Sequence, residues 1–129
     1  GHPLAAVVAF LNSPETLAVL RKITGHAAIA RVDAQATRYG PGHFLHPHDD
    51  LDAGKGRLAA YVLNMTPEWR PEWGGVLNFL DQDGHIAEGY APRFNALNIF
   101  DVGVSHYVGY VAPYALYPRL SVTGWLRSA

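Results

Sequence analysis

The chain has 129 residues, a formal net charge of −1 and no cysteine. A chain of this length buries enough surface to form one domain with a hydrophobic core, and a second domain would not fit. The lack of cysteine excludes disulfides, thiolate zinc sites and cysteine nucleophiles, so a metal here would be held by nitrogen and oxygen. The balanced charge argues against a nucleic-acid partner, and no apolar run reaches the roughly 18 residues that span a bilayer. We therefore expect a cytoplasmic protein without nucleic-acid or membrane partners.

The N-terminal part of the sequence predicts a helix over about 14–24. Residues 12–15 supply an N-cap candidate, a proline for the first turn and an early acidic residue. The residues that follow are apolar at helical spacing, and Lys22 and Gly25 mark the end of the helix. An apolar stripe of this kind is far more often core than a partner-binding surface.

From residue 27 onward the sequence changes to short β-rich runs broken by glycine and proline. Uneven alternation covers 27–39, a hairpin turn is predicted at 81–84, and loops are predicted at 50–56, 66–75 and 113–118. Strands are predicted over 58–65, 75–80, 85–91, 96–102, 105–112 and 119–126. Regular short strands with turn signals are typical of a sandwich or barrel. The expected fold class is therefore mainly β with an N-terminal helix, and the barrel covers about 27–127.

Residues 42–52 hold three of the seven histidines together with three carboxylates. His48 and Asp50 are two residues apart, and in an extended segment such side chains leave the backbone on the same side. A mononuclear non-haem Fe(II) site uses two imidazoles and one carboxylate. His106, in an apolar stretch far downstream, is the candidate for the second imidazole. We interpret these three residues as a candidate iron site.

The last predicted strand alternates cleanly, so Arg119, Ser121, Thr123 and Trp125 share one face. On an outer strand this polar face would simply be in contact with water. At the mouth of a barrel, an arginine with a hydroxyl two residues further on is instead a ready carboxylate clamp, because the guanidinium fork matches a carboxylate bidentately. The strand pattern alone leaves both interpretations open.

In chain order, His48-x-Asp50, His106 and Arg119 resemble the Fe(II)/2-oxoglutarate-dependent dioxygenases. Three further segments resemble the prolyl 4-hydroxylase branch of that superfamily: Tyr-Gly-Pro-Gly-His-Phe-Leu at 39–45, Trp69 with Glu-Trp-Gly-Gly at 72–75, and Arg-x-Ser-x-Thr-Gly-Trp at 119–125. Within this branch the likeness is nearest to the small proteins related to the ribosomal-protein prolyl hydroxylases. The resemblance covers about 39–127 and implies a double-stranded β-helix, a jelly-roll or cupin-like barrel, as one oxygenase domain over 1–129.

The resemblance also implies a cofactor site. His48, Asp50 and His106 would bind Fe(II), and Arg119 with Ser121 would bind the distal carboxylate of 2-oxoglutarate, with O2 as the third reactant. Enzymes of this kind couple the oxidative decarboxylation of 2-oxoglutarate to the hydroxylation of a C–H bond. The likeness favours a prolyl residue in a protein or peptide as the substrate.

Five more residues are placed around this site by the resemblance. Tyr39 would line the cosubstrate pocket, and Asn64 stands where relatives often carry a tyrosine that hydrogen-bonds the cosubstrate. Trp125 would pack beside the iron. Trp69 and Trp73 would either cap the barrel or cover a substrate, and the sequence gives these two roles equal weight.

Other interpretations stay open at this point. A cupin-type metal site would use His46-x-His48, and a barrel with a degenerate site would be a non-catalytic interaction module. Within the enzyme interpretation, a free amino acid or another small metabolite is the alternative substrate, and a homodimer is a further expectation. His43 and His46 are otherwise expected as supporting or surface groups, and His85 as an exposed residue beside the hairpin turn.

Overall fold

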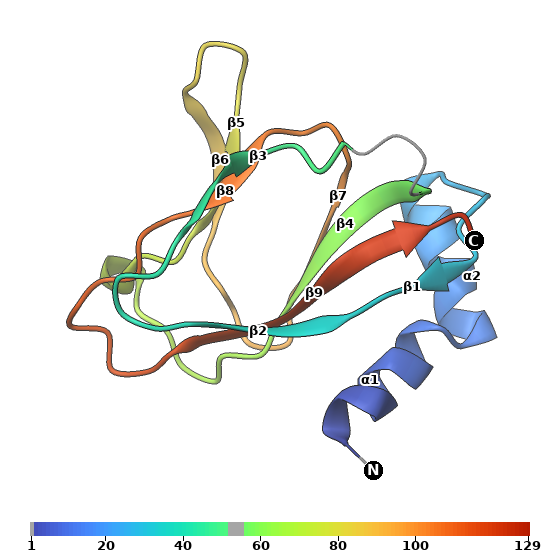
Figure 1. Ribbon diagram of the computed structural model, residues 1–129, viewed down its shortest axis with the longest axis horizontal. Coiled ribbons are helices and arrows are strands. Elements are labelled where there is room, and N and C mark those ends of the chain that lie inside the picture. Colours follow the sequence, from blue (N-terminus) through green and yellow to red (C-terminus); the bar gives the residue numbers. More distant parts are fainter. Residues whose placement is uncertain (1, 52–55) are drawn as a thin grey trace.

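Two helices lie against the outside of a barrel of two antiparallel sheets, as the computed structural model shows (Figure 1). The structure describes residues 2–51 and 56–129, so residues 52–55 of the predicted loop 50–56 lie outside the described residues. In the described part of the chain, no single helix is long and apolar enough to cross a bilayer. Only the two helices taken together, bent by 59° at their junction, have the length and composition of a span.

Helix α2 (Pro14–Thr24) begins and ends close to where the sequence predicts. The Ser13 hydroxyl accepts the backbone N–H of Thr16 at 3.3 Å, and Gly25 closes the helix in a left-handed conformation with φ 76°. The preceding helix, α1 (Pro3–Leu11), is not predicted from the sequence. Its residues are apolar on nearly every side, so it lacks the polar face by which an amphipathic helix is recognised.

The two sheets face one another and supply the barrel. The larger sheet has the strand order β1-β9-β4-β7, with β2 also paired to β9, and the smaller sheet has the order β3-β8-β5-β6. The strands are β1 (Arg31–Val32), β2 (Gln35–Tyr39), β3 (Leu45–His48), β4 (Arg57–Asn64), β5 (Leu77–Leu80), β6 (Ile86–Tyr90), β7 (Leu97–Asp101), β8 (His106–Val108) and β9 (Arg119–Arg127). A turn of 3-10 helix, η1 (Pro71–Trp73), follows β4. This arrangement confirms the expected double-stranded β-helix.

The predicted strands agree with the observed ones in place and differ mainly at their ends. The run 27–39 divides into β1 and β2. Strand β8 covers only 3 residues of the predicted run 105–112, and beyond it Gly74 and Val111 form an isolated bridge. Strand β3 gives little hydropathy signal because it is mostly exposed and contains Pro47. It can carry this proline because it is an edge strand of the smaller sheet.

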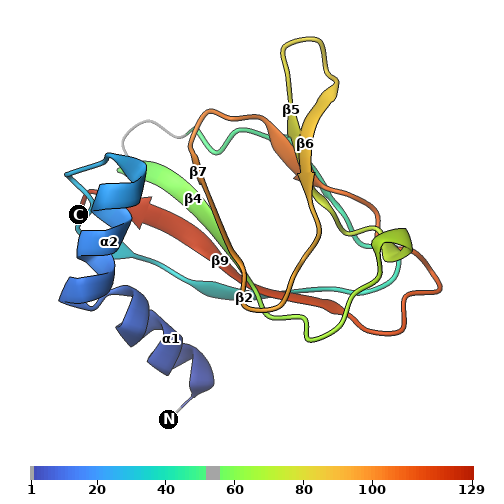
Figure 2. The ribbon, with the colours of Figure 1, turned by 180° about the vertical axis from the view of Figure 1, so that it is seen from behind.

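Strand β9 separates the core under the helices from the barrel interior. Val122 and Leu126 belong to the same buried cluster as Leu17 and Leu20 of α2, and Figure 2 shows both helices outside the larger sheet. The residues on the opposite face line a pocket inside the barrel: Arg119, Ser121, Thr123 and Trp125. The alternation predicted for this strand is confirmed, and it decides which side chains reach the interior.

Candidate active site

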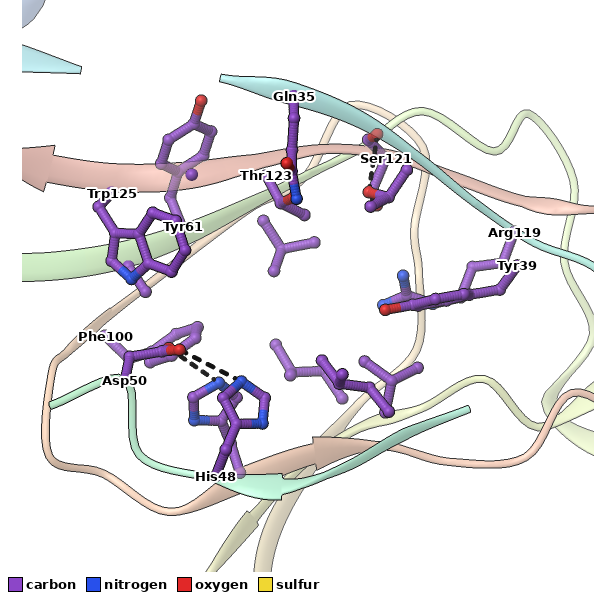
Figure 3. Close-up of a pocket in the computed structure, with 18 residues that line it drawn as sticks. Gln35, Tyr39, His48, Asp50, Tyr61, Phe100, Arg119, Ser121, Thr123 and Trp125 are labelled. Carbon is purple, nitrogen blue, oxygen red and sulfur yellow. Dashed lines mark hydrogen bonds and ion pairs between the residues drawn. The ribbon is translucent and has the colours of Figure 1, made fainter. Parts of the chain in front are cut away.

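A pocket of about 290 Å³ lies inside the barrel, between the two sheets (Figure 3). His48 and Asp50 lie at one end of it, and Arg119 and Tyr39 lie at the other. Most of its exposed surface is apolar, and Leu77 is among the apolar lining residues. The pocket therefore presents one polar group of residues at each end.

The register of β3 and β8 brings the two histidines together. His48 is the last residue of β3 and pairs directly with His106, the first residue of β8, so their ring centroids lie 4.1 Å apart. Oδ1 of Asp50 lies 3.3 Å from Nε2 of His48, and its Oδ2 lies 3.2 Å from Nε2 of His106. The structure thus gathers the three side chains that the sequence singles out, with one ligand atom from each within 4.8 Å of the others.

Asp50 reaches this position by a route that the sequence analysis does not anticipate. The prediction treats His48 and Asp50 as alternate residues of one extended segment, but β3 ends at His48, and Asp50 has a left-handed backbone with φ 61°. Aspartate tolerates this conformation better than most residues, although the conformation still costs free energy. The Asp49 carboxylate supports the turn by accepting the N–H of Leu51 at 3.0 Å. Backbone conformations of this kind cluster at functional sites.

Both imidazoles are oriented by backbone carbonyl groups. Nδ1 of His48 lies 2.8 Å from the carbonyl oxygen of His46, and Nδ1 of His106 lies 2.8 Å from that of Val104. A carbonyl oxygen only accepts hydrogen bonds, so each Nδ1 carries the proton and donates it. In the neutral imidazole each Nε2 then carries the lone pair, directed at the cluster, as a metal-binding histidine requires.

The protonation states of the cluster are coupled. Burial alone would raise the pKa of Asp50, but the hydrogen bond to His106 and the positive charges of His48, His106 and Arg57 lower it. Burial alone would lower the pKa of His106, but the carboxylate of Asp50 and the Val104 carbonyl raise it. These shifts stabilise Asp50 as a carboxylate beside a protonated His106. A divalent cation would satisfy the same carboxylate in place of that proton.

This donor set fits Fe(II). Two neutral imidazoles and one carboxylate on one side of the ion are the ligands of mononuclear non-haem iron centres, which keep their remaining positions open. The side chains of Asp50 and His106 are 11% and 5% exposed and that of His48 is 32% exposed, so the cluster is partly open to solvent, on the side of His48. Within residues 2–51 and 56–129, this is the one group of three histidine or acidic side chains close enough to hold a metal.

Arg119 is a buried cation at the other end of the pocket. Only 2% of the residue is exposed. Its Nε donates to the carbonyl oxygen of Gly75 at 2.7 Å, and its guanidinium carbon lies 5.6 Å from the ring centre of Tyr39. No carboxylate of the described residues pairs with it. Burial lowers the pKa of Arg119 to about 10, and Tyr39 partly offsets this effect; the group is still charged at neutral pH.

The two consecutive glycines before β5 allow the backbone to approach Arg119. Gly75 has φ +62°, and a Cβ there would lie 3.0 Å from Cδ of Arg119 and 3.1 Å from the Trp69 ring. The Trp69 Nε1–H donates to the carbonyl oxygen of Gly74 at 2.9 Å. Trp69 and Trp73 meet edge to face with ring centres 5.3 Å apart, and Trp73 is buried. The loop therefore shapes the arginine end of the pocket from outside.

The structure does not bring every predicted residue into the pocket. Trp69 and Trp73 pack behind it, which favours the capping role over the substrate-covering role. The Asn64 amide donates to the carbonyl oxygen of Ala96 and to Oδ1 of Asn98, both at 2.9 Å. Asn64 is not among the pocket-lining residues, so its expected contact with the cosubstrate has no support. The prediction overlooks that strand β7 would use this amide.

The histidine of the cupin alternative also lies outside the pocket. The His46 ring is exposed and meets Phe44 edge to face with ring centres 5.0 Å apart. Nδ1 of His43 accepts the N–H of Gly40 at 2.9 Å, and His85 is exposed. Among the described residues, His46 therefore does not join His48 in a group close enough to hold a metal.

Several pocket residues are absent from the sequence-based site. Gln35 and Thr37 enter from β2, Tyr61 from β4 and Phe100 from β7. Phe100 packs against the His106 ring with centroids 4.6 Å apart, and Oγ1 of Thr37 lies 2.8 Å from Oγ of Ser121. The sequence around these residues shows only alternation within strands. Alternation alone does not identify the face of a strand that points into the barrel.

The fold and the two polar ends of the pocket together define a class of protein. A double-stranded β-helix with a two-histidine, one-carboxylate cluster and a facing guanidinium has the parts of a non-haem iron oxygenase that uses a dicarboxylate. The chain belongs to the 2OG-Fe(II) oxygenase superfamily, whose sequence model matches residues 34–127. The family implies Fe(II), 2-oxoglutarate and O2, and the described cluster fits them.

Prolyl hydroxylases are prominent among the similar proteins. Prolyl 3-hydroxylase OGFOD1 of Xenopus laevis is 36% identical in an alignment 115 residues long that covers 84% of this chain and 22% of that protein. The protein of the same name from Mus musculus is 33% identical in an alignment 113 residues long that covers 82% of this chain and 20% of that protein. A crystal structure of a Pseudomonas putida prolyl-4-hydroxylase matches with TM-score 0.75 and 27% identity, over 92% of this chain and 64% of that chain. The chain thus spans about a fifth of the length of these curated relatives.

Proposed function

We propose that this chain is an Fe(II)- and 2-oxoglutarate-dependent hydroxylase of prolyl residues in a protein or peptide. One observation carries the proposal. Arg119, a buried guanidinium with no carboxylate partner among the described residues, lines the same pocket as His48, Asp50 and His106. Burying such a charge is costly unless an anion compensates it, and a 2-oxo dicarboxylate would offer one end to the guanidinium and the other to the metal. The likeness to prolyl hydroxylases supports proline as the target.

Each polar group of the pocket has a task in this proposal. Nε2 of His48, Nε2 of His106 and the Asp50 carboxylate would hold the iron, with Nδ1 of each histidine tied to a backbone carbonyl. Arg119 would hold the distal carboxylate of the cosubstrate through the nitrogens that Gly75 does not occupy. When bound, Fe(II) and 2-oxoglutarate supply the oxidation of a C–H bond by O2, coupled to decarboxylation to succinate and CO2. The apolar walls exclude water from that reaction.

The proposal is tested by incubating the protein in air with Fe(II), 2-oxoglutarate and a panel of proline-containing peptides. We expect a peptide product one oxygen heavier that depends on 2-oxoglutarate, with succinate formed in step. A peptide whose proline is replaced by alanine is the matched control. Nuclear magnetic resonance of the product would then distinguish hydroxylation at C3 from hydroxylation at C4, the two positions named for the relatives.

Two outcomes would overturn this assignment. A product from free proline or another small metabolite, but from no peptide, would make the chain a small-molecule hydroxylase. A folded, iron-loaded protein that forms neither an oxygenated product nor succinate would be a non-catalytic metal-binding module.

A further inference from the structure

Asp33 lies between β1 and β2, outside the pocket, and bonds to Trp125 of the pocket wall and to Tyr61 of the core under the helices. Its backbone N–H donates to the carbonyl oxygen of Trp125 at 3.2 Å, and its Oδ1 accepts the backbone N–H of Trp125 at 2.7 Å. Its carbonyl oxygen accepts the hydroxyl of Tyr61 at 2.6 Å. Oδ2 accepts a hydrogen bond from Nε of Arg127. One residue thus binds both backbone polar groups of Trp125 and the phenol of Tyr61.

Gly124 makes this close approach possible. It pairs with Tyr61 across β4 and β9, and a Cβ at this position would lie 2.2 Å from the carbonyl oxygen and 2.6 Å from Oδ1 of Asp33. Any side chain here would force Asp33 away from the strand. The requirement for Asp33 to lie directly on β9 therefore explains the glycine in the sequence Thr-Gly-Trp at 123–125.

The Trp125 indole is not fixed by its own N–H group. Nε1 is buried and has no hydrogen-bond partner in the part of the chain that the structure describes. The ring is instead stacked, with the guanidinium carbon of Arg57 3.7 Å from its centroid. The guanidinium carbon of Arg127, which Asp33 binds, lies 5.8 Å from the same centroid. Asp33 therefore holds the Trp125 backbone directly and one of the two cations over its ring.

The pocket wall made by Trp125 lies at the metal end of the pocket. Figure 3 shows the Trp125 indole beside Asp50, far from Arg119 and Tyr39. The Tyr61 ring belongs instead to the core cluster on the helix side of the sheet, with Val122 and Leu126. We propose that Asp33 is a positioning residue, which holds Trp125 as the wall that confines the substrate beside the metal ligands, while Tyr61 fixes Asp33 from the helix side of the sheet. This inference rests on the proposed hydroxylase function. It predicts that substitution of Asp33 lowers turnover of the substrate that is to be hydroxylated and leaves the affinity for 2-oxoglutarate unchanged.

The direct test follows the three tryptophans by fluorine nuclear magnetic resonance after labelling with 5-fluorotryptophan, with each resonance assigned by a Trp→Phe variant. Asp33→Ala is expected to shift or broaden the Trp125 resonance and to leave those of Trp69 and Trp73 in place. Asp33→Asn keeps an acceptor for the Trp125 N–H and is expected to restore the resonance, although it loses the ion pair with Arg127.

Asn12→Ala is the matched control. The Asn12 amide donates to the carbonyl oxygen of Val32 and accepts its N–H, both at 2.8 Å, so this variant also loosens β1 but does so on the helix side. It should lower stability without moving the Trp125 resonance. In peptide turnover, Asp33→Ala should lose about tenfold to a hundredfold in kcat/KM, the scale of a small misplacement in an active site. The Kd for 2-oxoglutarate should stay within about twofold, because its contacts are elsewhere.

An unmoved Trp125 resonance in folded Asp33→Ala would overturn the proposal, and so would a loss of 2-oxoglutarate affinity as large as the loss of peptide turnover. If Asp33→Ala does not fold, Asp33→Asn is the variant to test. A shifted Trp125 resonance in Asp33→Asn would mean that the ion pair with Arg127, and not the hydrogen bond to the Trp125 N–H, positions the indole. The resonance measurement needs no substrate. Failure of the hydroxylase assignment is therefore distinguishable from failure of this inference.

Discussion

Replacing Arg119 with methionine should separate ligand binding from stability. Nε of Arg119 already donates to Gly75, so two nitrogens are left for the two oxygens of a carboxylate. A hydrogen bond to a charged group contributes about 1.5 to 3 kcal/mol, which makes the pair worth roughly 3 to 6 kcal/mol. At about 1.4 kcal/mol per factor of ten, Arg119→Met should weaken 2-oxoglutarate binding by roughly 10² to 10⁴.

The same substitution should leave the ligand-free protein at least as stable. The variant loses the charge-assisted bond to Gly75, about 1.5 to 3 kcal/mol, but it also removes a buried charge that no carboxylate of the described residues compensates and whose burial costs several kcal/mol. The assay is an anaerobic titration of the Fe(II) protein with 2-oxoglutarate, followed by its visible charge-transfer band, alongside thermal unfolding without ligand. Arg119→Lys keeps the charge but loses the fork, and should bind with intermediate affinity.

Two results would refute this reasoning. If Arg119→Met weakens 2-oxoglutarate binding by less than about tenfold, the guanidinium does not hold the cosubstrate by a bidentate contact. If the variant loses several kcal/mol of unfolding free energy, the arginine is a structural group whose charge is compensated within the fold.

Three further predictions concern the metal end and the glycine pair. Asp50→Ala should abolish tight metal binding and His46→Ala should keep it; the reverse result, by metal analysis after dialysis, would restore the cupin alternative. The pKa of His106 is raised above its usual 6.5, so protons should begin to compete with the metal for this imidazole at a pH above 6.5. The affinity for the metal should therefore fall as the pH is lowered. Calorimetry in buffers of different ionisation enthalpy would show proton release at pH 6.5, and its absence would contradict the shift. Gly75→Ala should lower the unfolding free energy more than Gly84→Ala, because both have positive φ but only Gly75 has side chains within 3.0 to 3.1 Å of the added Cβ; equal losses would show that the neighbours yield freely.

The convergence of the histidines and the arginine was within reach of the sequence. Alternation in a nine-residue strand, β9, places Arg119 and Trp125 on one face. Strands β3 and β8 pair antiparallel, and in the observed register His48 lies directly opposite His106. In a long strand, the alternation of residues predicts which side chains share a face.

The remaining features depend on tertiary contacts that periodicity does not encode. Asp50 reaches the site through a left-handed backbone after β3, and Asn64 is diverted by partners on β7. Phe100 lines the pocket from a short edge strand whose alternation does not identify its inner face. Asp33 bonds to the backbone of β9, and it can lie this close to the strand because residue 124 is glycine.

The central claim is that His48, Asp50, His106 and Arg119 form one site for a metal and a dicarboxylate. A crystal structure of the protein with Mn(II), as a stand-in for Fe(II), and 2-oxoglutarate under anaerobic conditions tests it most directly. The account predicts one ion on Nε2 of both histidines and on the Asp50 carboxylate, with the distal carboxylate of the ligand on the Arg119 guanidinium. An ion bound elsewhere, or a ligand that does not touch Arg119, would contradict it.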